Sequence, residues 1–208
     1  MKISKHIHSC LLVEEAGKVI LIDPGNYTFE EGGLNIGKIE KLDAILVTHG
    51  HPDHLHPPLI EKVLERFPDV KIFGNASVKT ILAQERIPVA SEAGDIFEMI
   101  NAPHELLLGG LTAENTLFNI FGKLTHPGDS LQFNKICDVL ALPITAPWGS
   151  FVASVEKAAD VKPKIVIPIH DWHWKDSARK KLYDTAKNYL SARSIDFRGL
   201  ETGEEVTI

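Results

Sequence analysis

Four potential metal ligands lie within six residues, directly after a short apolar run. Residues 48–54 read Thr-His-Gly-His-Pro-Asp-His and follow the predicted strand 43–47. Imidazole and carboxylate groups are the ligands that zinc-like divalent ions take in proteins. Polar groups at the end of a buried strand are costly without partners, and a metal supplies them. A solvated polar loop is the alternative for any single histidine. For His49, His51, Asp53 and His54 together, the spacing predicts a metal site.

Three further candidate ligands each follow another predicted strand. They are His104, Asp129 and His170. Alone, each fits a loop or core residue better than a ligand, but groups at strand ends can converge on one edge of a sheet. With the first cluster they make seven groups. Seven ligands exceed what one tetrahedral zinc needs and suit two ions that share a bridging carboxylate.

The order of apolar segments predicts an α/β chain with two mixed sheets packed face to face and helices outside. Runs 9–13 and 18–23 predict a hairpin that ends in the turn Asp23-Pro24-Gly25. Asn75 and Ser150 are expected to cap helices, and Asp176 to begin the longest helix. Residues 26–41 are expected to be a loop, and residues 195–208 a closing strand pair. Further strands are predicted at 70–73, 95–100, 116–121, 139–144 and 164–169, and a further helix at 59–67.

Length and charge limit the classes of protein that fit. A chain of 208 residues predicts one domain over residues 1–208, with two small domains as the alternative. The net charge of −6 argues against a nucleic-acid surface, and the basic run at residues 179–181 reads as a solvated helix face. With no apolar run long enough for a bilayer and no signal peptide, we expect a cytoplasmic protein with no membrane contact. Its expected partner is a small-molecule substrate, and a homo-oligomer is left open.

The two cysteines offer a weaker alternative chemistry. Cys10 and Cys137 lie far apart in apolar segments, which favours buried reduced thiols over a disulfide. Neither lies in a nucleophile motif, and no serine nucleophile elbow, P-loop or dinucleotide glycine motif competes with the metal ligands.

The segment His-x-His-x-Asp-His after a strand resembles the metallo-β-lactamase fold superfamily. Other segments resemble its L-ascorbate-6-phosphate-lactonase-like branch of metal-dependent hydrolases. These segments are residues 8–12, 21–24, 128–130, 141–143 and 167–170. The resemblance extends from residue 8 to about residue 203 and implies an αββα sandwich with metals at one edge of the sheets.

The resemblance also implies how the ligands are shared between two ions. It assigns His49, His51 and His104 to the first ion, and Asp53, His54 and His170 to the second, with Asp129 bridging. Asp23 matches a family aspartate beneath the site that orients the histidine loop. An aspartate that caps the turn before Pro24 is an equal and compatible reading. His8 matches a family histidine near the site that is not usually a ligand.

Two departures from the family pattern bear on the site. The residues after His104 lack the usual small polar side chains, which makes His126 a competitor for the third ligand of the first ion. Four ring residues, Trp148, Trp172, His173 and Trp174, replace other residues at the pocket rim. They could contact an apolar or ring-shaped substrate, or simply pack.

These features predict a binuclear metal-dependent hydrolase with two divalent ions, Zn or Mn, with Fe also compatible. A metal-bridging hydroxide would cleave a small ester, lactone or phosphodiester, and Asp53 would steer the water proton. A di-iron redox or sensory protein on the same fold is the first alternative. A nuclease of the same superfamily is the second, and the acidic balance disfavours it.

Overall fold

The computed structural model describes residues 1–90 and 95–208. In this part the chain forms two compact units. The first contains residues 1–90 and 200–208, and the second contains residues 95–199. Each unit has its own six-stranded sheet and its own apolar core.

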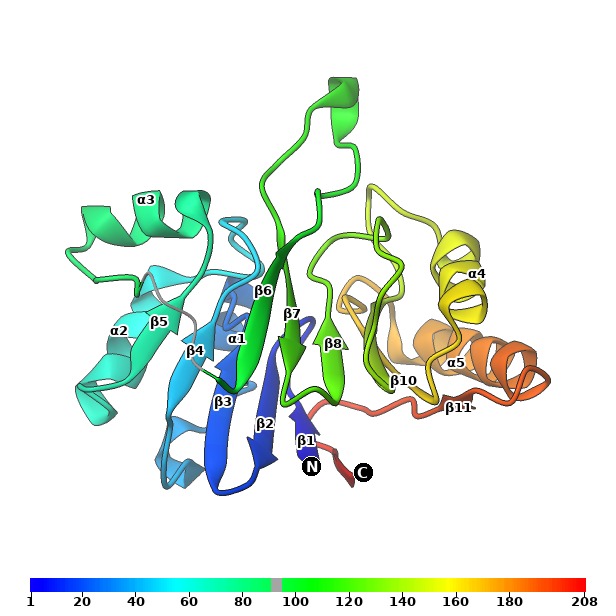
Figure 1. Cartoon of the computed structure of the whole chain (residues 1–208), viewed down its shortest axis with the longest axis horizontal. Helices are drawn as coiled ribbons and strands as arrows, with labels where there is room; N and C mark the ends of the chain where they lie inside the picture. The colour runs from blue at the N-terminus through cyan, green and yellow to red at the C-terminus, as the bar shows by residue number, and fades with distance from the viewer. Residues whose placement is uncertain (91–94) are drawn as a thin grey trace. The chain divides into compact units, whose positions relative to one another are not determined.

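The sheet of the first unit has the strand order β12-β1-β2-β3-β4-β5 (Figure 1). Its strands are β1 (Lys2–Lys5), β2 (Leu11–Glu15), β3 (Lys18–Ile22), β4 (Ala44–Leu46), β5 (Lys71–Phe73) and β12 (Glu205–Thr207). The pairs from β12 to β3 are antiparallel, and β3, β4 and β5 are parallel. The helical segments are α1 (Asn26–Glu30), the 3-10 turn η1 (Ile36–Lys38), α2 (Pro57–Arg66) and α3 (Ala76–Gln84).

The core of the first unit lies between this sheet and helices α2 and α3. Ile60 and Val63 of α2 lie one helical turn apart and are fully buried, as are Val78 and Leu82 of α3. They pack with sheet residues such as Ile45 in one apolar cluster. Spacings of three and four residues place these side chains on one face of each helix, the face that is buried.

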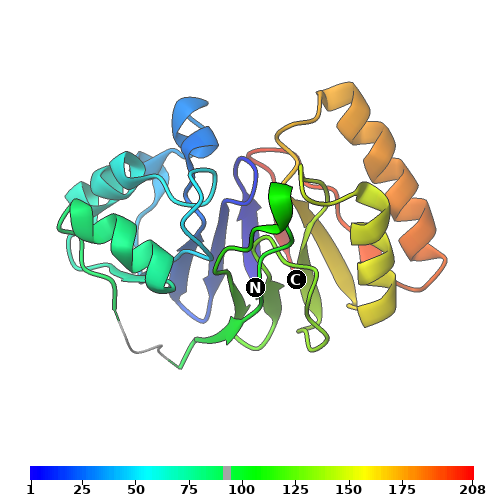
Figure 2. The ribbon, with the colours of Figure 1, turned by 90° about the horizontal axis from the view of Figure 1, so that it is seen from above.

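The sheet of the second unit has the order β11-β10-β9-β8-β7-β6. Its strands are β6 (Phe97–Asn101), β7 (Thr116–Ile120), β8 (Leu124–His126), β9 (Val139–Pro143), β10 (Ile165–Ile169) and β11 (Asp196–Phe197). The 3-10 turn η2 (Leu108–Gly110) lies at the tip of the β6–β7 connection (Figure 1). Helices α4 (Phe151–Val161) and α5 (Asp176–Ser191) lie side by side against this sheet (Figure 2). Ala158, Ala186 and Leu190 are fully buried against sheet residues such as Leu140 and Val166.

Most of the predicted elements are present. The β2–β3 hairpin pairs Leu11 with Ile22, and α5 begins at Asp176, as predicted. Asn75 caps α3 by accepting from the Val78 N–H, and Ser150 caps α4 by accepting from the Ala153 N–H.

Three predictions need correction. The segment 26–41 is not only a loop, because α1 and η1 form within it. The short strands β1 and β8 were not predicted. The expected strand pair at the carboxyl end is wrong, since β11 pairs parallel with β10 while β12 pairs antiparallel with β1. Strand partners so far apart in sequence are set by tertiary packing, which no local pattern records.

Strand direction decides where the polar segments lie. In the first sheet β1, β3, β4 and β5 run the same way, and in the second sheet β6, β8, β9 and β10 do so. The segments that leave the carboxyl ends of these strands therefore meet at one edge of their own sheet. In the parts 1–90 and 95–208, no helix is both long and apolar enough to cross a membrane.

The capping residues Asn75 and Ser150 allow a matched test of what their side-chain hydrogen bonds contribute to stability. Asn75 also donates from Nδ2 to the Thr48 carbonyl at 3.0 Å, which ties α3 to the histidine loop. We expect Ser150→Ala to lower the free energy of unfolding by about 1 kcal/mol, through loss of the cap. Asn75→Ala should lower it by about 2 kcal/mol, because the hydrogen bonds with the Thr48 carbonyl and the Ser77 hydroxyl are lost along with the cap. Chemical denaturation measures both, and equal losses would contradict the role given to the Thr48 contact.

Candidate metal centre

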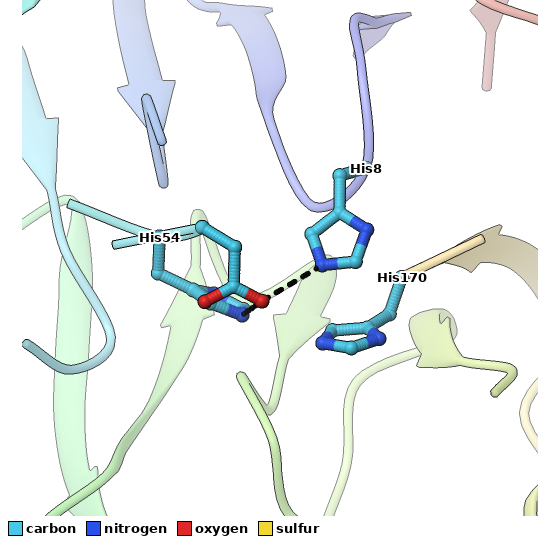
Figure 3. A group of neighbouring side chains, drawn as sticks. His8, His54 and His170 are labelled. Atoms are coloured by element: carbon cyan, nitrogen blue, oxygen red, sulfur yellow. Dashed lines mark hydrogen bonds and ion pairs between the residues drawn. The ribbon is translucent and has the colours of Figure 1, made fainter. Parts of the chain in front are cut away.

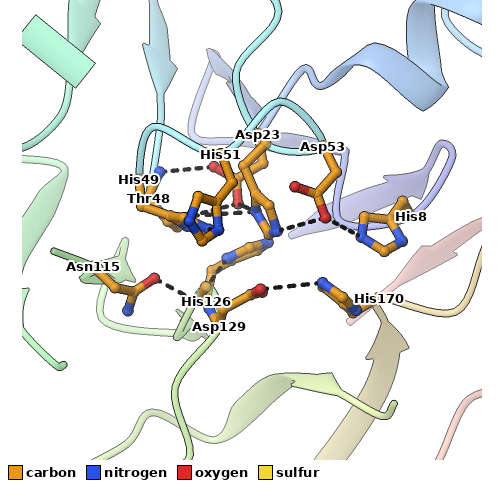
Figure 4. Close-up of polar contacts among 12 residues, drawn as sticks. His8, Asp23, Thr48, His49, His51, Asp53, Asn115, His126, Asp129 and His170 are labelled. Atoms are coloured by element: carbon orange, nitrogen blue, oxygen red, sulfur yellow. Dashed lines mark hydrogen bonds and ion pairs between the residues drawn. The ribbon is translucent and has the colours of Figure 1, made fainter. Parts of the chain in front are cut away.

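The histidine loop of the first unit rests on a buried aspartate. The Asp23 carboxylate is inaccessible to solvent and accepts the Thr48 N–H at 2.8 Å and the Thr48 hydroxyl at 2.8 Å (Figure 4). It also faces His54 Nδ1 at 2.7 Å. An ionised carboxylate only accepts, so His54 donates from Nδ1, and in the neutral ring the lone pair lies on Nε2. Asp23 thus lies beneath the loop, as expected, and presents Nε2 of His54 as a ligand atom.

Thr48 extends this control to a second histidine. Its hydroxyl hydrogen is donated to Asp23, so the oxygen accepts from His49 Nδ1 at 3.0 Å. The lone pair of neutral His49 is therefore on Nε2, which lies 3.0 Å from Nδ1 of His51. One buried carboxylate sets the tautomers of His54 directly and of His49 through a hydroxyl.

The turn after Asp23 fixes the position of the loop. A Cβ atom at Gly25 would lie 1.8 Å from the Asp53 carbonyl oxygen, so only glycine fits there. Asn26 N–H donates to the Pro52 carbonyl at 2.8 Å, and His56 N–H donates to the Pro24 carbonyl at 3.2 Å. The two segments are thus joined backbone to backbone.

Besides the pair His49 and His51, the first unit brings a second set of candidate ligands together. They are Asp53, His54 and His8. His8 Nε2 lies 3.2 Å from Asp53 Oδ2, and His54 Nε2 lies 3.8 Å from the same oxygen (Figure 3). Each of the three offers a ligand atom within 4.8 Å of those of the others. Tyr27 packs edge-on against His8, and burial together with the Asp53 charge raises the pKa of its phenol. The sequence placed His8 near the site but outside the ligand set, and its contact with Asp53 is new.

The second unit brings His104, Asp129 and His170 together. His104 donates from Nδ1 to the Glu105 carbonyl, and His170 donates from Nδ1 to the Thr145 carbonyl, both at 2.6 Å. A carbonyl only accepts, so neutral His104 and His170 each carry the lone pair on Nε2. Those two atoms lie 3.3 and 3.2 Å from Asp129 Oδ2.

This arrangement places lone pairs opposite a carboxylate oxygen and therefore suits a cation. Two ligand atoms held about 2.1 Å from one zinc ion at a tetrahedral angle lie about 3.4 Å apart. The Nε2–Oδ2 separations of 3.2 and 3.3 Å are close to this value. Protons on both Nε2 atoms could also lie between the imidazoles and Asp129 Oδ2. They would leave two buried imidazolium ions beside each other, which is costly. Imidazole and carboxylate groups with their Nδ1 atoms already engaged fit divalent ions.

The residues that orient Asp129 were not foreseen. Its backbone N–H donates to Asn115 Oδ1 at 3.1 Å (Figure 4). Asn115 Nδ2 donates to the Ala102 and Pro127 carbonyls at 2.8 Å each. Trp148 Nε1–H donates to Asp129 Oδ2 at 2.9 Å. Asn115 precedes β7 in an unremarkable polar segment, so no sequence signal marks it.

Comparison with known proteins identifies the family. The model of the β-lactamase superfamily domain matches residues 2–170. The chain belongs to the metallo-β-lactamase superfamily. A UPF0173 protein from Pyrococcus furiosus is 32% identical over 194 residues, which cover 82% of this chain and 83% of that protein. A UPF0173 metal-dependent hydrolase from Geobacillus thermodenitrificans is 52% identical over 58 residues, 26% of this chain and 24% of the relative.

Solved structures support the fold of this superfamily member. The metallo hydrolase Igni18 from Ignicoccus hospitalis has a TM-score of 0.69 and 21% identity, covering 99% of this chain and 97% of Igni18. At that identity the likeness concerns the fold alone. Together with two mixed six-stranded sheets and their helices, it confirms the predicted fold class.

His126 makes different contacts from His104. It is fully buried in β8, and its Nδ1 accepts the Gly128 N–H at 3.4 Å. Neutral His126 then carries its hydrogen on Nε2, so this nitrogen is a hydrogen-bond donor and has no lone pair to offer a metal ion. Of the two competitors, His104 is the one that the structure places against Asp129.

Neither cysteine has the properties of a nucleophile. Both are free thiols, but only Cys10 is buried as expected, while Cys137 is half-buried. Burial raises the pKa of Cys10 far above its usual range and also raises the pKa of Cys137. Both thiols stay protonated at neutral pH, which removes the thiolate that nucleophilic catalysis requires.

The role of Asp23 can be tested against a second aspartate of the same unit. Asn in place of Asp23 would turn one oxygen into an NH₂ donor that faces the donors of Thr48 or His54. We expect Asp23→Asn to lower the free energy of unfolding by about 3 kcal/mol. Asp43, which pairs with Lys18 at 3.0 Å, is the control, and Asp43→Asn should cost about 1 kcal/mol or less. Urea denaturation compares the two, and a loss for Asp23→Asn no larger than the control would show that the carboxylate does not hold the loop.

Proposed function

We propose that this chain is a binuclear metal-dependent hydrolase of the metallo-β-lactamase superfamily. The observation that carries the proposal is the pair of imidazole lone pairs, on His104 and His170, that flank one oxygen of Asp129 at 3.3 and 3.2 Å. The names of the UPF0173 metal-dependent hydrolases support the reaction class.

Each unit alone offers too few ligands for two closed sites, which is why we assign the site to both. His49 and His51 from the first unit, with His104 from the second, would hold one ion. Asp53 and His54, with His170, would hold the other, and Asp129 would bridge. Residues 1–208 would then act as a single domain. The support is chemical: every ligand named is an imidazole or carboxylate, and each ion receives three besides the bridge.

Divalent ions, when bound, lower the pKa of water toward neutrality and polarise a carbonyl or phosphoryl oxygen. The protein's own contribution begins at Asp53, the residue we assign as catalytic. Its carboxylate is partly exposed and would accept the proton of the attacking water. His8, 3.2 Å away, would keep Oδ2 of that carboxylate directed into the site.

The substrate we propose is a small ester, lactone or phosphodiester. A net charge of −6 disfavours a nucleic-acid polymer, which needs a basic surface. Imidazole and carboxylate ligands accept Zn, Mn or Fe. We propose Zn or Mn, because hydrolysis uses the ions as Lewis acids and needs no redox change.

Replacing one ligand from each unit tests the site. We expect His51→Ala and Asp129→Ala each to abolish metal-dependent turnover in a panel of lactones, phosphodiesters and esters with added Mn or Zn. Elemental analysis of protein purified without chelator should find two ions per parent chain, one or fewer in His51→Ala, and neither tightly bound in Asp129→Ala, because a bridge serves both.

His56→Ala is the matched control, since His56 belongs to the same loop but lies outside the proposed ligand set. It should keep both ions and its activity. Unchanged turnover in His51→Ala or Asp129→Ala would contradict the site. A di-iron spectrum without hydrolysis of any member of the panel would instead favour the redox or sensory alternative.

A further inference from the structure

Trp148 makes a contact that the metal site does not explain. It lies in the turn between β9 and α4, where Ala146 and Gly149 form an isolated backbone bridge. The indole Nε1–H donates to Asp129 Oδ2 at 2.9 Å. That oxygen is the one that His104 Nε2 and His170 Nε2 also face.

The ring of Trp148 also packs against both imidazoles. Its centroid is 5.6 Å from that of His104 and 5.6 Å from that of His170, with interplanar angles of 69° and 62°. These are edge-to-face contacts within the favourable range for aromatic pairs. One side chain thus touches all three candidate ligands of the second unit.

The same turn orients His170 by a second route. The Thr145 carbonyl accepts from His170 Nδ1 at 2.6 Å, three residues before Trp148. Residues 145–149 therefore supply one acceptor that fixes an imidazole and one donor that fixes a carboxylate. Asp129 is also held at its backbone by Asn115, but a bond to the backbone does not itself set the side-chain torsions that orient the carboxylate.

We propose that Trp148 is a positioning residue for metal binding, and that it holds Oδ2 of Asp129 where the ions bound by His104 and His170 could share it. This inference rests on the proposed function. Loss of the N–H would have two opposing effects. The oxygen would become more basic, which strengthens a bond to a single ion, but the carboxylate could rotate. For an oxygen that would serve two ions at once, orientation decides the outcome, and affinity falls.

The test is a titration of metal-free protein with Zn²⁺ against a competing chelator, for the parent, Trp148→Phe and Trp172→Phe. Phenylalanine keeps an aromatic ring but removes the N–H donor. We expect Trp148→Phe to bind Zn²⁺ about 10- to 100-fold more weakly than the parent. Trp172→Phe, the control for loss of an indole elsewhere in the same unit, should bind within about twofold of the parent. The unfolding temperature of the metal-free proteins should differ little, because the contact orients a side chain.

A second readout follows the indole itself. With Trp172 and Trp174 both changed to Phe, Trp148 is the remaining tryptophan, and Zn²⁺ should shift its emission in step with binding. Parent-like or tighter affinity in Trp148→Phe, or no change in emission at saturation, would overturn the proposal. Failure of the parent to bind Zn²⁺ at all would instead overturn the proposed function, so the two failures are distinguishable.

Discussion

The buried carboxylate of Asp23 is the interaction on which the first unit's site depends. A fully buried charge is costly unless strong hydrogen bonds replace water. Asp23 receives them from the Thr48 backbone, the Thr48 hydroxyl and His54, all within 2.8 Å. In return it fixes which nitrogen of His54 carries the hydrogen, and through Thr48 it fixes the same for His49. Burying the Asp23 charge opposes folding, but the same charge orients the lone pairs of the histidines in the loop.

The second unit reaches the same result by different means. Backbone carbonyls of Glu105 and Thr145, rather than a carboxylate, accept from His104 and His170. These acceptors carry no net charge, and the negative charge of this unit's group comes from Asp129, whose Oδ2 lies 3.3 and 3.2 Å from the two Nε2 atoms. In both solutions, a neutral imidazole carries its lone pair on Nε2 and presents it to the ligand side. Orientation before binding lowers the entropy that an incoming ion must remove, so residues that touch no ion still influence its affinity.

Sequence reasoning succeeded where a feature is encoded by residues that are close together in the chain. The cluster at residues 49–54, the Asp23-Pro24-Gly25 turn and the caps at Asn75 and Ser150 each carry a local signal, and each is present in the fold. It failed where the partner is distant. The three-residue strand β8 is too short to be recognised by periodicity alone, and β12 pairs with β1 across nearly the whole chain instead of with β11. Asn115 and Trp148 orient Asp129 from separate loops, and nothing in their own segments indicates that contact.

Gly25 shows how closely the fold and the site are joined in this superfamily member. The Asp23 carboxylate can reach beneath the loop only because the backbone turns at once, with Asp23 itself in the left-handed region at φ 44°. The chain then passes so near the Asp53 carbonyl that any side chain at Gly25 would collide with it. A substitution at Gly25 would push on Asp53 and His54 although neither residue changes. A glycine with no chemistry of its own is therefore a condition for the position of the carboxylate that we propose as catalytic, because the loop and the turn are joined backbone to backbone.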